Sequence, residues 1–533
     1  MAAVRRLMQN HLVMKIPDRD CKNILRCWDK NVSDPRKKIW QQPFKMRTPM
    51  NLLTKIALIR SGTLLPAALM LFISVGCAVV GPDYVPPDTP MPEAWHTPAK
   101  SDLVAEHLNK EALASWWSIF DDPVLTNLVE SAVAGNLGFK EARARVREAR
   151  ARRGISEADR FPTIDASGSV RSSRSSEETG SGRERELYAA GFDAAWELDV
   201  FGGKKRVVEV AGAELQASEE NLRDVLVSLL AEVALNYVEL RSFQTRLSVA
   251  EANLNAQKET YNITQWRRQA GLTTQLDVEQ AKYSLEQTRA QIPGLQTGLE
   301  RAKNRLAVLI GQHPGSLRDA LAERKAIPVT PLEVAVGVPA DILRRRPDVR
   351  RAERQLGAQT AQIGVATADL YPRFSLLGSI GLEALSPGNL FSFDSRTHGI
   401  GSTVTWPLFD AGAIRGNIEV QSALQQQALI RYEAAVLAAL EDVENALVAY
   451  AKEQSRRQSL TEATEAARRA VELAQIQYSS GLIEFGNVLI AQRSLLSLQD
   501  QLAVSEGGVT SNLIALYKSL GGGWKSLIPD NTN

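Results

Sequence analysis

Residues that could carry out catalysis or hold a metal are few in this 533-residue chain and are scattered along it. The histidines share no metal-ligand spacing with cysteine, aspartate or one another; they are His11, His96, His107, His313 and His398. The glycine-rich stretch Gly521–Ser526 lacks the spacing of a phosphate-binding loop and follows a predicted helix instead of preceding one, so a turn is favoured. No nucleophile-elbow serine motif is present. We therefore expect no enzyme, no cofactor and no metal site.

One cysteine, Cys77, has a position that predicts a modification. It ends a segment with two basic residues, Lys55 and Arg60, and an apolar run, Leu64–Val75. About twelve apolar residues are too few for a transmembrane helix, which needs about twenty, but they suit the core of a signal peptide. The segment resembles a bacterial lipoprotein signal, in which the cysteine becomes the lipidated N-terminus. With Ala78 after the cysteine, the resemblance implies an outer-membrane lipoprotein. The alternative is an ordinary signal peptide with an incidental cysteine.

The charge distribution supports a removed leader. Residues 1–76 hold 14 Lys and Arg against 4 Asp and Glu, which leaves 49 against 57 from Cys77 onward and a net charge of −8. An acidic mature protein argues against a nucleic-acid partner. We expect Met46 or Met50 to be the start, so that 1–45 is an over-extended N-terminus and 46–76 is the signal peptide.

The rest of the chain repeats itself at an offset of 210 residues. Ala158–Val170 aligns with Ala368–Ile380, and Gly271–Ala281 aligns with Gly481–Ala491. A heptad series of apolar residues also recurs at this offset; Leu285, Ile292, Leu299 and Leu306 match Leu495, Leu502, Val509 and Leu516. One offset for three independent features indicates an internal duplication.

Each half is predicted to contain two very long helices. Apolar residues at spacings of three, four and seven predict coiled-coil helices over about 207–266 and 273–311, and again over about 412–478 and 486–520. A sixty-residue helix is about 90 Å long. Pro293 lies inside the second of these helices and predicts a kink there.

Each half also contains two segments that alternate with period two. They lie at about 163–174, 186–200, 373–385 and 399–409. In the second, Phe192 and Trp196 lie on the apolar face and Asp193 and Glu197 on the polar face. Strands of about ten residues with one apolar face fit a membrane β-barrel; a soluble sheet resting on the helices is the alternative. Four strands cannot close in lipid. Two chains would give eight strands and three would give twelve, which leave room for a lumen, so a conduit favours a trimer.

At this point the chain resembles the TolC-type outer-membrane efflux proteins, in their lipoprotein (NodT-type) branch. The motifs that carry the resemblance are GPDYVPP after Cys77, Trp116–Asn136, the connector Gly337–Glu353 and Leu516–Trp524. In the connector, Asp341 can cap one helix, and Pro347 and Asp348 suit the first turn of the next. We divide the chain into an N-terminal extended segment (77–115), a first repeat (116–315), a connector (316–340), a second repeat (341–525) and a tail (526–533).

The resemblance implies a mainly α fold with a β-barrel contribution: a homotrimer with a twelve-stranded outer-membrane barrel continuous with a periplasmic barrel of helices. It implies contact with outer-membrane lipid, docking onto a periplasmic adaptor protein and a proton-driven inner-membrane pump, and passive export of small molecules such as drugs. Two alternatives remain. One is a duct for secreted polypeptides, and the other is a lipid-anchored periplasmic coiled-coil structural or adaptor protein.

The turns of the two helical hairpins are the predicted functional positions. By resemblance they form the periplasmic entrance and the adaptor contact; the predicted contact residues are Gly271, Leu272, Thr273, Gly481, Leu482 and Ile483. In the family the second turn carries a tyrosine followed by carboxylates, and this chain has the tyrosine but not the aligned carboxylate. The aperture candidates are Tyr478, Asn487, Asp277, Glu279, Arg267 and Arg268. We expect the two carboxylates to pair with the two arginines across neighbouring helices and to hold the entrance shut.

Overall fold

The computed structural model describes residues 79–88, 92, 95–96, 103–104, 113–328, 334–335 and 344–524. Contacts divide the chain into Met1–Val75 and Gly76–Asn533, and all described residues belong to the second unit. Cys77, the signal segment and Asp341 lie outside the described residues.

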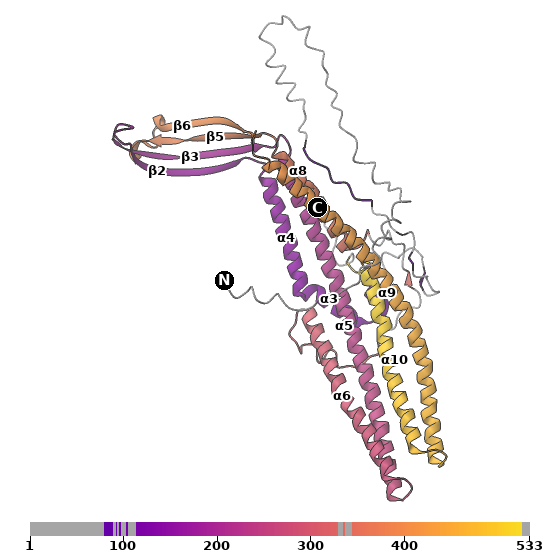
Figure 1. The fold of residues 1–533 in the computed structure, drawn as a ribbon. Coiled ribbons are helices and arrows are strands. Elements are labelled where there is room, and N and C mark those ends of the chain that lie inside the picture. The colour runs from indigo at the N-terminus through magenta and orange to yellow at the C-terminus, as the bar shows by residue number, and fades with distance from the viewer. Residues whose placement is uncertain are drawn as a thin grey trace, which may run out of the picture. The chain divides into compact units, whose positions relative to one another are not determined.

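The duplication predicted from the sequence is present element by element (Figure 1). The first repeat contains α4 (Leu137–Ala158), β2 (Thr163–Arg174), β3 (Glu184–Leu198), α5 (Gly203–Gln269) and α6 (Gln275–Leu309). The second contains α8 (Pro347–Ala368), β5 (Arg373–Ala384), β6 (Arg396–Thr405), α9 (Ala413–Ser479) and α10 (Phe485–Ser519). Both ends of each helix, and of β2 and β5, are related by 210 residues.

Short elements lie outside this repeated order. A 3-10 helix (Trp116–Phe120) and α3 (Pro123–Gly135) precede the first repeat. The two-residue strands β1 (Leu103–Val104) and β4 (Val334–Ala335) pair in parallel.

The long helices form two antiparallel hairpins. Helices α5 and α9 have 67 residues each and α6 and α10 have 35 each, so the longer ones extend about 100 Å. They begin or end up to four residues beyond the predicted bounds. Helix α6 continues through Pro293. Among the described residues, no helix combines the length and the apolar character needed to cross a bilayer.

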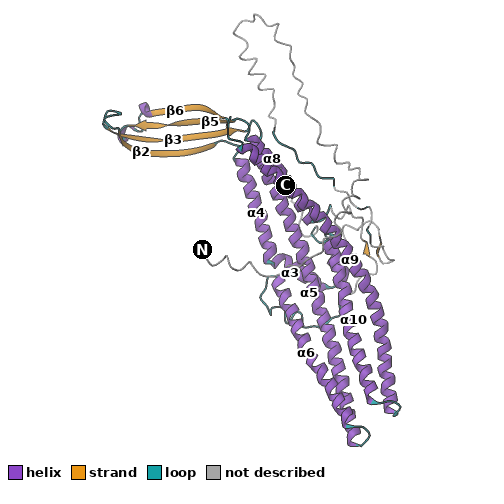
Figure 2. Cartoon of the chain, viewed as in Figure 1, coloured by secondary structure: helices purple, strands orange, loops and turns teal. Residues whose placement is uncertain are grey.

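The four strands form one antiparallel sheet in the order β2-β3-β5-β6 (Figure 2). In its register Phe192 faces Ala166 on one side and Ile380 on the other, so that even-numbered residues share one face. This face is mainly apolar, as the alternation predicts. On the opposite face Ser167 Oγ donates a hydrogen bond to Asp193 Oδ2 at 2.8 Å. The outer edges of β2 and β6 have no neighbouring strand in the described part of this chain.

Two tryptophans fix the ends of the strands that adjoin the helices. The indole N–H of Trp196 donates to the carbonyl of Arg160 at 2.9 Å, and that of Trp406 donates to the carbonyl of Leu370 at 3.0 Å. The donors and the acceptors are each 210 residues apart, so the repeat extends to this tertiary hydrogen bond.

The main core lies near the middle of the helices. Trp116 is buried and stacks on Tyr517 of α10 with ring centroids 5.8 Å apart. Burial raises the pKa of the Tyr517 hydroxyl to about 12. Leu230 of α5 and Leu306 of α6 are fully buried in the same cluster. Aromatic and leucine side chains from four helices thus join the two repeats at this level.

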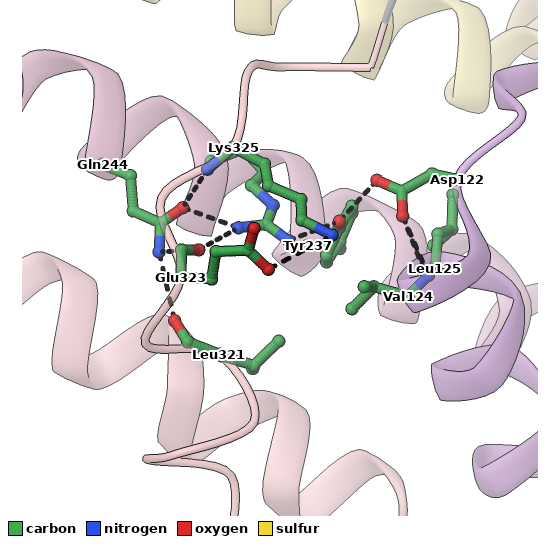
Figure 3. Close-up of polar contacts among 9 residues, drawn as sticks. Asp122, Val124, Leu125, Tyr237, Gln244, Leu321, Glu323 and Lys325 are labelled. Atoms are coloured by element: carbon green, nitrogen blue, oxygen red, sulfur yellow. Dashed lines mark hydrogen bonds and ion pairs between the residues drawn. The ribbon is translucent and has the colours of Figure 1, made fainter.

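A buried polar network fastens this core to the loop that follows α6 (Figure 3). Arg241 of α5 is 1% exposed, and its guanidinium donates to the Tyr237 hydroxyl at 2.7 Å and to the Glu323 carbonyl at 2.8 Å. Gln244 donates to the carbonyl of Leu321, and Tyr237 donates to Asp122, which caps α3. Burial and the hydrogen bond to Asp122 raise the pKa of the Tyr237 hydroxyl. A buried cation is stable only when it is hydrogen-bonded in this way.

The start of α8 fulfils the prediction for the connector. Pro347 is its first residue and Asp348 lies in its first turn. Arg346 forms ion pairs with Asp348 at 2.8 Å and with Asp442 of α9 at 2.9 Å, and donates to the carbonyl of Ser519. Burial alone would raise the pKa of Asp348, but the hydrogen bond and charge of Arg346 outweigh it and lower this pKa. The connector arginine therefore joins α8, α9 and the end of α10.

Residues 79–84, which we call the N-terminal strap, lie along the start of α5 and the outer part of α8. Arg206 of α5 donates to the carbonyls of Val80 and Gly81 at 3.0 and 3.1 Å and pairs with Asp83 at 2.8 Å. The Tyr84 hydroxyl donates to Glu353 of α8 at 3.2 Å. The strap thus covers one face of the second repeat.

Candidate functional site at the hairpin tips

The two hairpin turns have the same backbone geometry. Gly271 and Gly481 have φ values of 71° and 74°, in the left-handed region that glycine adopts most readily. The N–H of Leu272 donates to the carbonyl of Arg267 at 2.8 Å, and the N–H of Leu482 donates to that of Gln477 at 2.9 Å. These 6→1 bonds are those of a Schellman motif, which ends a helix and reverses the chain. The predicted tip glycines therefore make the reversal.

The first tip is further fixed by a capping box at the start of α6. Thr274 is the N-cap, and its side chain accepts from the N–H of Asp277 while Asp277 accepts from the N–H of Thr274. Thr273 and Thr274 also donate their hydroxyls to the same Asp277 oxygen at 2.6 and 2.7 Å. Partial burial would raise the pKa of Asp277, but these three hydrogen bonds outweigh it and lower this pKa. Asp277 is therefore a helix cap.

The expected pairing of the tip carboxylates with arginines is not found within the described part of the chain. Asp277 bonds to the two threonines, and Glu279 accepts from the side chain of Gln275 at 2.8 Å. Arg268 is exposed. An Asp277–arginine pair across different chains stays a prediction, and its carboxylate would have to exchange or share hydrogen bonds that it already makes.

Arg267 instead contacts the second hairpin. Its guanidinium lies over the ring of Tyr478, 4.6 Å from the centroid. Tyr478 also packs against Phe485, with centroids 5.3 Å apart, beside a small apolar cluster that includes Ala281 of α6. A reciprocal contact lies farther from the tips, where Arg493 of α10 lies over the ring of Tyr283 of α6 at 5.0 Å. Two cation–π contacts thus cross between the hairpins, one in each direction.

Two polar atoms at this crossing have no partner. The Nε of Arg267 and the hydroxyl of Tyr478 are buried and make no hydrogen bond within the described protein. Buried polar groups are nearly always satisfied. The contact therefore depends on the guanidinium and the ring face, while the hydroxyl contributes no hydrogen bond inside one chain.

The outer surface of the tips is apolar. Leu272 and Leu482 are 67% and 75% exposed, and they occupy equivalent positions in the two repeats. Trp266 and Ile476, also equivalent, are exposed one turn away. Thr273 and Ile483 are half-buried, and Asn487 is exposed beside the first turn of α10. Repeated, exposed apolar groups of this kind mark a surface that contacts another protein.

Sequence reasoning named Arg267 and Tyr478 separately but missed their contact, and it missed Arg493 and Tyr283 altogether. The partners lie on different hairpins, about 210 residues apart, and no local pattern specifies which faces of two hairpins pack together. The role of Asp277 could have been found, because Thr-x-x-Asp before a helix is a capping signal.

Comparisons with known proteins agree with this architecture. The sequence profile of the family described as outer membrane efflux protein matches residues 128–312 and 338–522, two segments that are again 210 residues apart. Nodulation protein T of Rhizobium leguminosarum bv. trifolii is 33% identical over 442 residues, which cover 80% of this chain and 90% of that protein. The solvent efflux pump outer membrane protein SrpC of Pseudomonas putida is 32% identical over 457 residues, or 84% of this chain and 96% of that protein.

A solved structure is similar over nearly its whole length. The outer-membrane channel OprN superposes with a TM-score of 0.79 and is 39% identical, covering 84% of this chain and 99% of that one.

Proposed function

The chain belongs to the outer membrane efflux protein family, and on that premise we propose how this non-enzymatic outer-membrane channel of a tripartite efflux system works. Family membership implies a trimer, an outer-membrane channel that extends into the periplasm, and pump partners. The observation that carries the proposal is the four-stranded sheet, which has one apolar face and two unpaired edges on the same chain as two hairpins of about 100 Å.

Three copies of this sheet complete a twelve-stranded barrel. The apolar face with Phe192, Trp196 and Ile380 faces lipid, and the face with Asp193 lines the lumen. An outer-membrane barrel must leave no edge unpaired, and joining β6 of one chain to β2 of the next satisfies both edges.

The tips form the periplasmic entrance and contact the adaptor protein. Leu272 and Leu482 supply repeated apolar contacts for the adaptor. The Arg267–Tyr478 contact holds the two hairpins of each chain together and favours the closed entrance. The tip carboxylates act on the local fold of their own hairpin, since Asp277 is used as a cap.

Two further parts of the proposal concern the chain's ends and its cargo. Cys77 is lipidated and anchors the mature N-terminus in the outer membrane, two residues before the strap begins. The cargo consists of organic solvents or antibiotics, the class named for the similar protein SrpC and its relatives. The inner-membrane pump is proton-driven and supplies the energy, because the channel carries no nucleotide site.

The experiment is reconstitution of the full-length protein in planar bilayers. We expect discrete conductance steps from a trimer, and hypersensitivity to toluene in cells that lack the protein. A purified trimer that inserts but never conducts, under any applied voltage, would exclude a conduit and favour the structural alternative.

A further inference from the structure

The duplication lets one surface be compared with its own copy. On α8, the N-terminal strap covers the face formed by Glu353, Gly357 and Gly364. Tyr84 bonds to Glu353 and lies against Gly357, and Gly81 packs so closely that an added Cβ would lie 2.4 Å from the Cα of Gly364. Glycine at 364 is therefore needed for the backbone of the strap to pass.

The equivalent face of α4 is uncovered. Subtracting 210 from the three α8 positions gives Arg143, Arg147 and Gly154. All three are exposed, and a Cβ on Gly154 would meet nothing within 4 Å. No described residue of this chain occupies the place that the strap takes in the second repeat.

Gly154 itself has no explanation in one chain. A glycine inside a helix is destabilising relative to alanine, and its copy, Gly364, is explained by the close approach of another backbone. The strap-binding Arg206 of α5 corresponds to Gly416 of α9, where an added Cβ also meets nothing within 4 Å. Both positions keep room for a backbone that the described residues do not supply.

The uncovered face is also strongly cationic. Lys140, Arg143, Arg147 and Arg150, which we call the α4 stripe, lie at i, i+3, i+7 and i+10 and extend about 15 Å. Among described residues, the carboxylate found near the stripe is Glu219, 3.8 Å from Arg150. The neighbouring arginines of α4 differ, because each has a glutamate four residues away on the same helix; these pairs are Glu141–Arg145, Glu148–Arg152 and Arg153–Glu157.

The copy on α8 has no such charge. The residues that match the stripe are Arg350, Glu353, Gly357 and Thr360. Arg350 is paired with the buried Glu220 at 2.8 Å. The face that the chain covers with its own strap is thus neutral, while the open face carries four positive charges.

We propose that the α4 stripe and Gly154 form a docking surface for an acidic, extended segment of a second protein. The segment would lie on α4 as the strap lies on α8, with its backbone against Gly154 and its carboxylates on the four cations. An extended chain presents alternate side chains about 6.6 Å apart, which suits cations spaced three and four residues apart on a helix. The surface lies on the upper helix before β2, away from the hairpin tips, so its partner is distinct from the adaptor.

A defined probe tests this surface in the purified full-length trimer. A fluorescent ten-residue glutamate peptide is titrated at 0.15 M salt, with the ten-residue glutamine peptide as the neutral reference. We expect the double variant R143Q/R147Q to weaken binding at least tenfold. The matched control R145Q/R152Q removes two positive charges from another face of the same helix and should change binding by less than twofold.

A second variant separates shape from charge. Gly154→Leu leaves the stripe intact but fills the place of the backbone, and we expect at least fivefold weaker peptide binding with unchanged trimer assembly. Equal loss in R143Q/R147Q and R145Q/R152Q would overturn the proposal, since it would show attraction by net charge alone. Stripe-dependent binding to vesicles of phosphatidylcholine and phosphatidylglycerol, without binding of the glutamate peptide, would also overturn it and identify a lipid site.

Discussion

Replacing Arg267 should loosen the closed entrance, because its guanidinium joins the first hairpin to the ring of Tyr478 on the second. Such a contact is worth about 0.5–2 kcal/mol, and its partial burial places it near the middle of this range. A trimer has three copies. If they open together, loss of about 1 kcal/mol in each changes the closed-to-open ratio by about 3 kcal/mol, or roughly a hundredfold.

The assay is single-channel recording of Arg267→Gln, with Arg268→Gln as the control. Both variants lose one positive charge at the same tip, but Arg268 is exposed and makes no ring contact in the described structure. We expect Arg267→Gln to raise the open probability strongly and Arg268→Gln to leave it nearly unchanged.

Two changes at Tyr478 test the physical basis. Since the Tyr478 hydroxyl has no partner in the described chain, Tyr478→Phe should behave like the wild type, whereas Tyr478→Leu should open the channel. The double variant Arg267→Gln/Tyr478→Leu should open it no further than either single change. Fully additive single effects, or a Tyr478→Phe channel as open as Tyr478→Leu, would refute the ring contact as the cause.

Four other predictions follow from named contacts. Asp277→Ala should weaken the first turn of α6 by about 1 kcal/mol, seen as faster amide exchange; because the pKa of Asp277 is lowered in the fold, wild-type protection should persist at neutral pH and decrease below about pH 4, while the variant stays flat. Arg241→Ala removes a buried, hydrogen-bonded cation and should lower the free energy of unfolding by about 3–5 kcal/mol, measured by thermal melting. Ile380→Lys on the lipid face should cost about 2–4 kcal/mol of barrel stability, against little change for Leu377→Lys on the other face, and equal losses would contradict the proposed orientation. Cys77→Ser should abolish acylation of the mature N-terminus in mass spectrometry yet leave the fold intact.

The sequence predicts the architecture because its signals are periodic and appear twice. The offset between Ala158–Val170 and Ala368–Ile380 holds for both ends of every long helix. Alternation along β3 predicts that Phe192 and Asp193 lie on opposite faces, and the register agrees. Long-range order of this kind is readable because each residue supports the same pattern.

The tip contacts were less predictable, since they depend on lateral packing. The bound partner of Arg267 is on a helix whose rotation about its axis is set by many small contacts, and charge alone suggested a carboxylate instead. The carboxylate, in turn, was satisfied locally: two threonine hydroxyls and one N–H lie closer along the chain than any arginine. Local hydrogen bonds compete with distant ion pairs and here they prevail.

The equal lengths of the two hairpins restrict how this chain can evolve. Helices α5 and α9 have 67 residues each, so both turns reach the same depth. A seven-residue insertion confined to α5 would push three of six turns about 10 Å beyond the others, and a partner could then seat on only half of the ring. Insertions and deletions in one half should therefore survive only with a matching change in the other, so that length is inherited as a coupled pair while side chains drift independently.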